Sequence, residues 1–187
     1  MAGHPSLQGP SLTGPKAWVF FGVFGSSVLL DQLTKWWVVS NIALYRGEVP
    51  IIPGFLSFIQ AQNPGAAFSM LRDFEYRIWL FIAFGLIAAG VILDLWRRLP
   101  KEDVTSALSL GLILGGAVGN LIDRVHKQTV TDFVRMYTDH PPLRAWLVDH
   151  FGTAEWPTYN VADMSLLFGV GLFLMHYLFL EDKGADA

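Results

Sequence analysis

The chain has 187 residues, of which 52% are hydrophobic and only 16% are charged. Ordinary globular chains carry about 25% charged residues, so this composition indicates a protein whose solvent is largely lipid. The formal net charge of −3 excludes a strongly basic nucleic-acid binder, and the absence of cysteine excludes disulfides, thiolate metal sites, iron–sulfur clusters and a cysteine nucleophile.

Residues 1–16 are rich in Pro, Gly and Ser, which predicts a flexible N-terminal tail. Four apolar segments follow, each close to the ~20 residues that a helix needs to cross a bilayer. We expect one integral membrane domain over residues 17–181 and a short C-terminal tail over residues 182–187. The expected transmembrane helices cover about 17–39, 77–96, 104–122 and 161–180.

The short connection between the second and third segments carries Arg97, Arg98 and Lys101. A basic cluster in a short loop is typical of the cytoplasmic side of a membrane. Because four spans place both termini on one side, we expect both termini in the cytoplasm and the two long connections outside. Of these, the first contains β-branched residues around 51–60 that favour short strands.

Ionisable residues within the spans need an explanation, because each costs about 2.5–3.5 kcal/mol even on the lenient insertion scale. Arg97 and Arg98 follow Asp94 by three and four residues, which predicts an interfacial ion pair. Asp31 and Lys35 are also four residues apart, but they lie at the outer end of the first segment. There an ion pair and a functional role are equally open.

Small residues in the third segment predict close helix packing, since Gly111, Gly115 and Gly119 repeat every four residues. A purely structural protein assembled through this glycine face is one alternative for the whole chain. Another is a proton-coupled carrier or small channel, in which intramembrane acids relay protons. A carrier is expected to show internal repeats, and we see no convincing repeat in the sequence.

Polar residues also collect at the outer ends of the third and fourth segments. They are Asn120, Asp123 and Arg124, then Asp132 in a β-branched stretch, and finally Asn160 and Asp163, three apart on one helical face. Two neighbouring carboxylates share one proton, which predicts aspartyl hydrolysis: the ionised member takes a proton from water while the protonated one polarises the scissile carbonyl. From spacing alone, helix capping by Asn160 or Asp163 is the more ordinary explanation.

Other catalytic patterns are missing. The sequence has no H-E-x-x-H, no G-x-S-x-G, no G-x-G-x-x-G and no P-loop. The pairs Asp139-His140 and Asp149-His150 are typical of a wet surface rather than of a metal site. We therefore expect no metal and no cofactor.

Five motifs occur in one order along most of the chain. They are LLDQLTK (29–35), QNPGAAFS (62–69), GGAVGNLIDR (115–124), TDF (131–133) and YNVAD (159–163). Through them the chain resembles the bacterial lipoprotein signal peptidases, also called signal peptidase II. Relative to that family, the stretch between the last two motifs is longer, with residues 139–156 as the insertion.

The resemblance implies an intramembrane aspartyl endopeptidase of the bacterial inner membrane. Such enzymes remove the signal peptide from diacylglyceryl-modified prolipoproteins by cutting before the lipidated cysteine, near the outer face. The resemblance places the catalytic pair on Asp132 and Asp163 and gives Asp123 a structural role. The supporting residues then fall on Asp31, Asn63, Gly65, Asn120, Arg124 and Asn160.

The implied fold is a mainly α membrane protein with four transmembrane helices, a small extracytoplasmic β-cradle and an interfacial helix. The first long connection supplies both the cradle and the interfacial helix. The implied partners are lipid-modified prolipoproteins, membrane lipids and globomycin-type inhibitors, with no nucleic acid.

Overall fold

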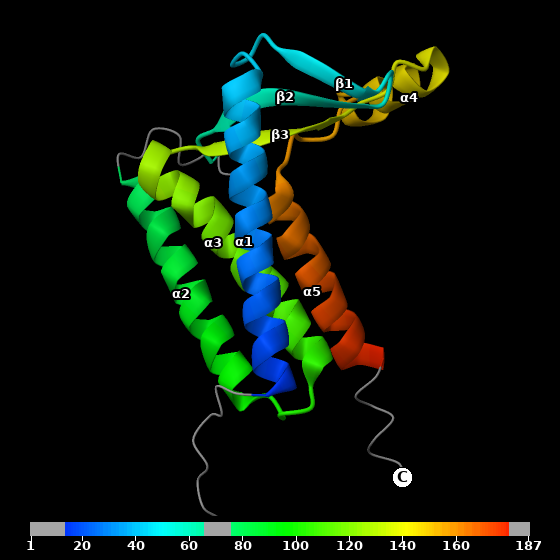
Figure 1. The fold of residues 1–187 in the computed structure, drawn as a ribbon. Helices are drawn as coiled ribbons and strands as arrows, with labels where there is room; N and C mark the ends of the chain where they lie inside the picture. Colours follow the sequence, from blue (N-terminus) through cyan, green and yellow to red (C-terminus); the bar gives the residue numbers. More distant parts are fainter. Residues whose placement is uncertain (1–13, 66–75, 180–187) are drawn as a thin grey trace, which may run out of the picture.

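The computed structural model of the chain describes residues 14–65 and 76–179, and four long helices dominate it (Figure 1). In chain order the elements are α1 (Pro15–Asn41), β1 (Glu48–Ile52), β2 (Leu56–Asn63), α2 (Arg77–Arg98), α3 (Val104–Lys127), β3 (Val130–Met136), α4 (Pro141–Phe151) and α5 (Val161–Phe179). Helices α1, α2, α3 and α5 are long and apolar enough to cross a membrane. The predicted class, a mainly helical membrane protein with four spans and a small β-sheet, is confirmed.

The helices extend past the apolar segments that predict them. Helix α1 begins at Pro15, inside the segment expected as a tail, because Lys16 is buried and donates to the carbonyl oxygens of Trp96 (2.9 Å) and Leu99 (2.7 Å). The Trp96 carbonyl also accepts from the N–H of Leu99 at 3.3 Å, and the lysine adds a second, shorter hydrogen bond to it at the end of α2. Helix α3 continues to Lys127, since hydropathy marks the lipid-facing length and not the end of the helix.

Helix α3 packs against α1, α2 and α5 (Figure 1). Its predicted glycine face makes these contacts close. A Cβ atom on Gly115 would lie 2.5 Å from Cβ of Ser27 in α1, and one on Gly119 would lie 2.6 Å from Oδ2 of Asp31. Only glycine lets the backbones of α3 and α1 come this close together, so the prediction of a packing face is confirmed.

The sheet lies at one end of the bundle and draws its strands from both long connections (Figure 1). Strands β1 and β2 form an antiparallel pair, and β3 pairs antiparallel with β2. Phe133 and Val134 of β3 pack with Val38 of α1 and with Ile42, the residue directly after that helix, which fixes the sheet on the end of α1. As a result, Asp132 in β3 lies beside the ends of the spans.

The helix content of the connections differs from the expectation. The interfacial helix expected in the first connection falls outside the described residues, since that connection is described only as far as Gly65. Helix α4 lies instead in the second connection, within the insertion at 139–156. It begins at Pro141, where a proline suits the first helical position because the missing N–H has no partner there anyway.

Candidate functional site

Asp132 is the third residue of β3, and its side chain is almost fully buried, with 4% of the residue exposed. Both of its carboxylate oxygens accept hydrogen bonds from amide side chains. Nδ2 of Asn160 donates to Oδ1 at 2.7 Å, and Nδ2 of Asn63 donates to Oδ2 at 2.9 Å. Asp132 is therefore held in one orientation by the segment before α5 and by the end of β2.

Asp163 lies in the first turn of α5, where Asn160 occupies the N-cap position. The Asp163 N–H donates to Oδ1 of Asn160 at 3.0 Å, and the Asn160 N–H donates to Oδ2 of Asp163 at 3.1 Å. This reciprocal pair is a capping box, with Asp in the place of the usual Glu. The helix dipole also favours a negative charge at this position. Asp163 therefore belongs both to the cap, with Asn160, and to the pair of carboxylates, with Asp132.

Asn120 in α3 completes a network between the two carboxylates. Its Nδ2 donates to Oδ1 of Asp163 at 2.8 Å, and its Oδ1 accepts from Nδ2 of Asn160 at 3.1 Å. Because the same Asn160 amide also donates to Asp132, one chain of hydrogen bonds joins Asp132 to Asp163 through two asparagines. The residues come from β3, α3 and α5, so only the tertiary fold assembles the pair.

A buried lysine lies beneath this network. Lys35 of α1 contacts Oδ2 of Asp31 at 2.8 Å and Oδ2 of Asp123 at 3.3 Å, and it donates to Oδ1 of Asn120 at 3.0 Å. Asp31 in turn accepts from the N–H of Ala162 at 2.9 Å. The predicted pairing of Asp31 with Lys35 is confirmed, and Lys35 also contacts Asn120 of the network.

Asp123 positions the strand that carries Asp132. Its Oδ2 accepts from the N–H of Thr131 at 2.9 Å, one residue before Asp132, and its Oδ1 lies 3.3 Å from Nζ of Lys127. A buried carboxylate with a backbone N–H and two ammonium groups around it is well compensated. Asp123 contacts the backbone of the strand and the two lysines, and its described contacts include neither carboxylate of the pair, Asp132 or Asp163.

Asn63 and Gly65 form a tight turn at the edge of the site. The N–H of Gly65 donates to Oδ1 of Asn63 at 2.9 Å, which leaves Nδ2 of Asn63 pointed at Asp132. Gly65 has φ +100°, a conformation that side chains disfavour, and a Cβ there would meet the Phe81 ring at 2.7 Å. Glycine at this position therefore allows the turn that aims Asn63.

Arg124 lies at the margin of the site. Its guanidinium stacks over the ring of Phe81, with 5.1 Å from Cζ to the ring centroid, and Nη1 donates to the Asn120 carbonyl at 3.3 Å. Its positive charge interacts electrostatically with Asp163 and Asp132, although no direct hydrogen bond to either is present among the described contacts. The cation–π contact keeps the guanidinium near the pair.

Burial raises the pKa of Asp132 from its ordinary value of 3.8 to about 6. Removal of the carboxylate from water is the largest cause, and the negative charge of Asp163 adds to it. The hydrogen bonds from Asn63 and Asn160 and the charge of Lys35 act in the opposite direction. The pKa of Asp132 therefore lies well above that of an ordinary aspartate, at about 6.

Every predicted site residue is described, and all of them fall within this region. Lys35 is the residue whose contact with the network the sequence did not reveal; its spacing from Asp31 predicted only an ion pair. Asp94 lies elsewhere, paired with Arg98 at 2.8 Å as predicted. Over residues 14–65 and 76–179, no group of three or more His, Cys, Asp or Glu side chains is arranged to hold a metal ion.

The fold and the site together define a multi-pass membrane protein with a paired-carboxylate centre at one end of its helical bundle. Residues 23–179 match the profile of the family described as signal peptidase (SPase) II. The chain belongs to the signal peptidase II family, and it is therefore a peptidase of the membrane.

Relatives that carry a name support the assignment to this family. The lipoprotein signal peptidase of Symbiobacterium thermophilum is 39% identical over 84% of this chain and 93% of its own length. The one from Geobacter metallireducens is 39% identical over 86% and 91%, and the one from Listeria welshimeri is 40% identical over 83% and 90%. Two solved bacterial membrane enzyme structures share the fold, with TM-scores of 0.71 and 0.69. They are 24% and 23% identical, over 86% and 90% of this chain and 93% and 91% of theirs.

Proposed function

We propose that this protein is an aspartyl endopeptidase that removes the signal peptide from diacylglyceryl-modified prolipoproteins by cutting before the lipidated cysteine. The observation that carries the proposal is the single hydrogen-bond network that joins Asp132 to Asp163 through Asn160 and Asn120. The names of its relatives supply the substrate class.

In the proposed reaction, Asp132 holds the shared proton and Asp163 is ionised. Asp163 accepts a proton from the attacking water, while Asp132 donates a hydrogen bond to the scissile carbonyl oxygen and polarises it. Asp163 then gives that proton to the nitrogen of the leaving amine as the C–N bond breaks and the carbonyl re-forms. Arg124 and Asn63 lie beside the pair, where they can bind the substrate backbone or stabilise the oxyanion. No metal or cofactor takes part in this scheme.

The balance of charges around the site supports a single shared proton. Within the described part of the chain, the cations around the site are the buried Lys35, the half-buried Arg124 and Lys127, whose side chain is 40% exposed. Asp31 and Asp123 supply two of the negative charges. If the catalytic pair holds one proton, it adds one further negative charge, so three negative charges face three positive charges.

The proposed location is the bacterial inner membrane, with both termini in the cytoplasm and the carboxylate pair near the outer face. The start of α1, the end of α5 and the connection from α2 to α3 lie at the end of the bundle opposite the sheet (Figure 1). That connection follows Arg97 and Arg98 and contains Lys101, as expected for a cytoplasmic loop. A lipidated substrate then reaches the pair laterally, with its acyl chains in the bilayer.

The test is cleavage of a diacylglyceryl-modified prolipoprotein by the purified protein in detergent, with the product read by mass. Asp132→Asn and Asp163→Asn should each abolish cleavage while the protein stays folded. Asp94→Asn is the matched control, because Asp94 is exposed and pairs only with Arg98 among the described contacts. A globomycin-type peptide should inhibit the wild type. Cleavage that survives in either dyad variant would contradict the mechanism, and proton flux in liposomes without any cleavage would favour the carrier.

A further inference from the structure

Helix α4 presents apolar side chains that the rest of the structure does not cover. All of α4 is described, and none of its residues is buried. Trp146 is 50% exposed and Phe151 67% exposed, and Leu143 is nearly half exposed. Each large apolar side chain left in water forgoes the favourable free energy of burial. An exposed apolar helix of this kind indicates a partner.

The apolar side of α4 forms one wall of an open groove. Leu143, Leu147 and Phe151 recur every four residues and so share one face of the helix. The opposite wall includes Met136 at the end of β3, together with Trp156. The groove has a volume of about 440 Å³ and adjoins the sheet that carries Asp132.

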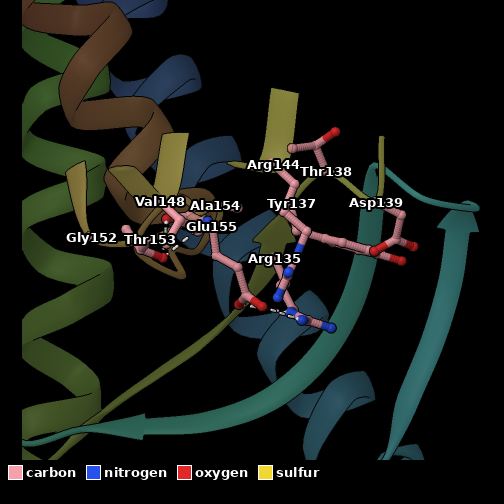
Figure 2. A pocket seen from close by; sticks show the side chains of 10 residues that line it. All are labelled: Arg135, Tyr137, Thr138, Asp139, Arg144, Val148, Gly152, Thr153, Ala154 and Glu155. Carbon is pink, nitrogen blue, oxygen red and sulfur yellow. Dashed lines mark hydrogen bonds and ion pairs between the residues drawn. The ribbon is translucent and has the colours of Figure 1, made fainter. Parts of the chain in front are cut away.

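The neighbouring side of α4 is charged. Figure 2 shows a second cavity lined by Arg135, Asp139, Arg144 and Glu155. Arg135 pairs with Glu155 and, at 3.2 Å, with Glu48, and its guanidinium lies 4.4 Å from the Tyr137 ring centroid. The unit made by α4 and the end of the sheet therefore has an apolar side and a polar side that meet along the same helix.

We infer that α4 is an interfacial helix whose apolar groove docks into the bilayer leaflet on the sheet side, with its charged cavity turned to the headgroups and water. The four spans fix the membrane, and α4 lies beyond them on the side where the sheet lies (Figure 1). Trp146 and Trp156 are the side chains that concentrate at membrane interfaces. The lipid-exposed surface of the spans makes a bilayer the partner already present beside this groove.

Docking of α4 has a consequence for the site. Helix α4 follows β3 after four residues, and the segment after α4 returns along β3 through the bridges Tyr137–Glu155 and Val134–Tyr159. A helix held at the interface therefore fixes the far end of the strand that carries Asp132. This inference rests on the membrane-spanning fold and is independent of the proposed peptidase activity.

The test uses the natural absence of cysteine, which allows single-cysteine labelling of the full chain. An NBD probe is attached at Leu143→Cys or Phe151→Cys on the groove side. Asp149→Cys is the matched control on the opposite face of the same helix, and Leu30→Cys is the control within an exposed part of α1. Each labelled protein is reconstituted into phosphatidylethanolamine and phosphatidylglycerol vesicles that contain spin-labelled lipids.

We expect lipids labelled near the headgroup to quench the Leu143→Cys and Phe151→Cys probes at least twofold more than they quench the Asp149→Cys probe. The Asp149→Cys probe should respond to aqueous iodide instead, and the Leu30→Cys probe to lipids labelled deep in the acyl chain. Groove-side probes that iodide quenches and lipid does not would overturn the inference. So would probes shielded from both quenchers, because the groove would then hold another protein segment or a second copy. No arm measures cleavage, so a failed peptidase assay leaves this result intact.

Discussion

Nζ of Lys35 donates a hydrogen bond to Oδ1 of Asn120 at 3.0 Å, and the lysine side chain is only 1% exposed. The lysine can only donate, so it holds the oxygen of this amide toward α1. The amide nitrogen of Asn120 is thereby turned toward Asp163, to which it donates at 2.8 Å. Lys35 is thus a positioning residue that sets the amide orientation on which the carboxylate network depends.

Replacement of Lys35 by Met should destabilise the protein by about 3–5 kcal/mol, because Asp31 and Asp123 would keep buried charges without their shared cation. Lys127→Met is the matched control. It removes a cation from the same Asp123, but the Lys127 side chain is 40% exposed, so the loss should be below about 1 kcal/mol. Unfolding by SDS in mixed micelles measures both. Equal losses in the two variants would contradict the role assigned to Lys35.

Two substitutions separate the capping and catalytic roles of Asn160. Asn160→Ala removes the acceptor for the Asp163 N–H and should cost about 1 kcal/mol of stability. Asn160→Ser keeps a capping oxygen and should retain most of that stability. Both variants lose the donor to Asp132, which is neutral in the proposed working state, and such a hydrogen bond contributes about 0.5–1.5 kcal/mol. Cleavage should therefore fall about 2- to 10-fold in both. If Asn160→Ser kept full activity, Asn160 would act only as a helix cap and not in catalysis.

The same residue shows what the sequence could and could not predict. The spacing of Asn160 and Asp163 places them on one helical face, which is what a capping box requires. The partner carboxylate Asp132 is far away in the sequence, so the spacing alone cannot show whether Asp163 is a cap or part of a catalytic pair. The four spans follow from hydropathy, since their apolar length is dictated by the bilayer. The contacts of Lys35 with Asn120 and Asp123 join α1 to α3, and helical spacing reports only neighbours within one helix.

Helix α4 was not predicted, and the reason lies in its first residues. Pro141-Pro142 reads as a break in a connection, yet proline at the first turn of a helix is favourable, and the eleven-residue helix begins there. The resemblance implied an interfacial helix in the first connection and no helix in this insertion.

The pH dependence of activity should report the pKa of Asp132. If the pair works with one shared proton, loss of the Asp132 proton near pH 6 produces the alkaline limb of kcat/KM, which reflects the free enzyme. Bound substrate covers the pair and removes more water, so the corresponding limb of kcat should lie at higher pH. Initial rates across pH 4–9 measure both limbs. The assignment would be contradicted if the alkaline limb of kcat lay at a lower pH than the alkaline limb of kcat/KM.

The raised pKa also predicts how stability depends on pH. Because the folded state holds the proton of Asp132 more tightly than the unfolded chain does, this group favours folding below about pH 4, and that contribution is lost as the pH rises through about 6. The shift from 3.8 corresponds to about 3 kcal/mol. Asp132→Asn should remove this dependence, so its stability relative to wild type should increase from pH 4 to pH 7. Thermal unfolding in detergent at each pH measures the difference, and a parallel pair of curves would contradict it.

Gly119 joins the packing of the bundle to the site, because a Cβ at this position would lie 2.6 Å from Oδ2 of Asp31 and 3.2 Å from Cβ of Ala162. Gly119→Ala should therefore push α1 and α5 away from α3, destabilise the protein by about 1–3 kcal/mol and lower cleavage as well. Gly90→Ala in α2 is the matched control, since no described atom lies within 4 Å of its added Cβ. There alanine should be neutral or stabilise by up to about 1 kcal/mol, because glycine is the poorer helix former. SDS unfolding and the cleavage assay on both variants test this, and a Gly119→Ala protein as stable and active as Gly90→Ala would show that the spans tolerate a wider separation at the site.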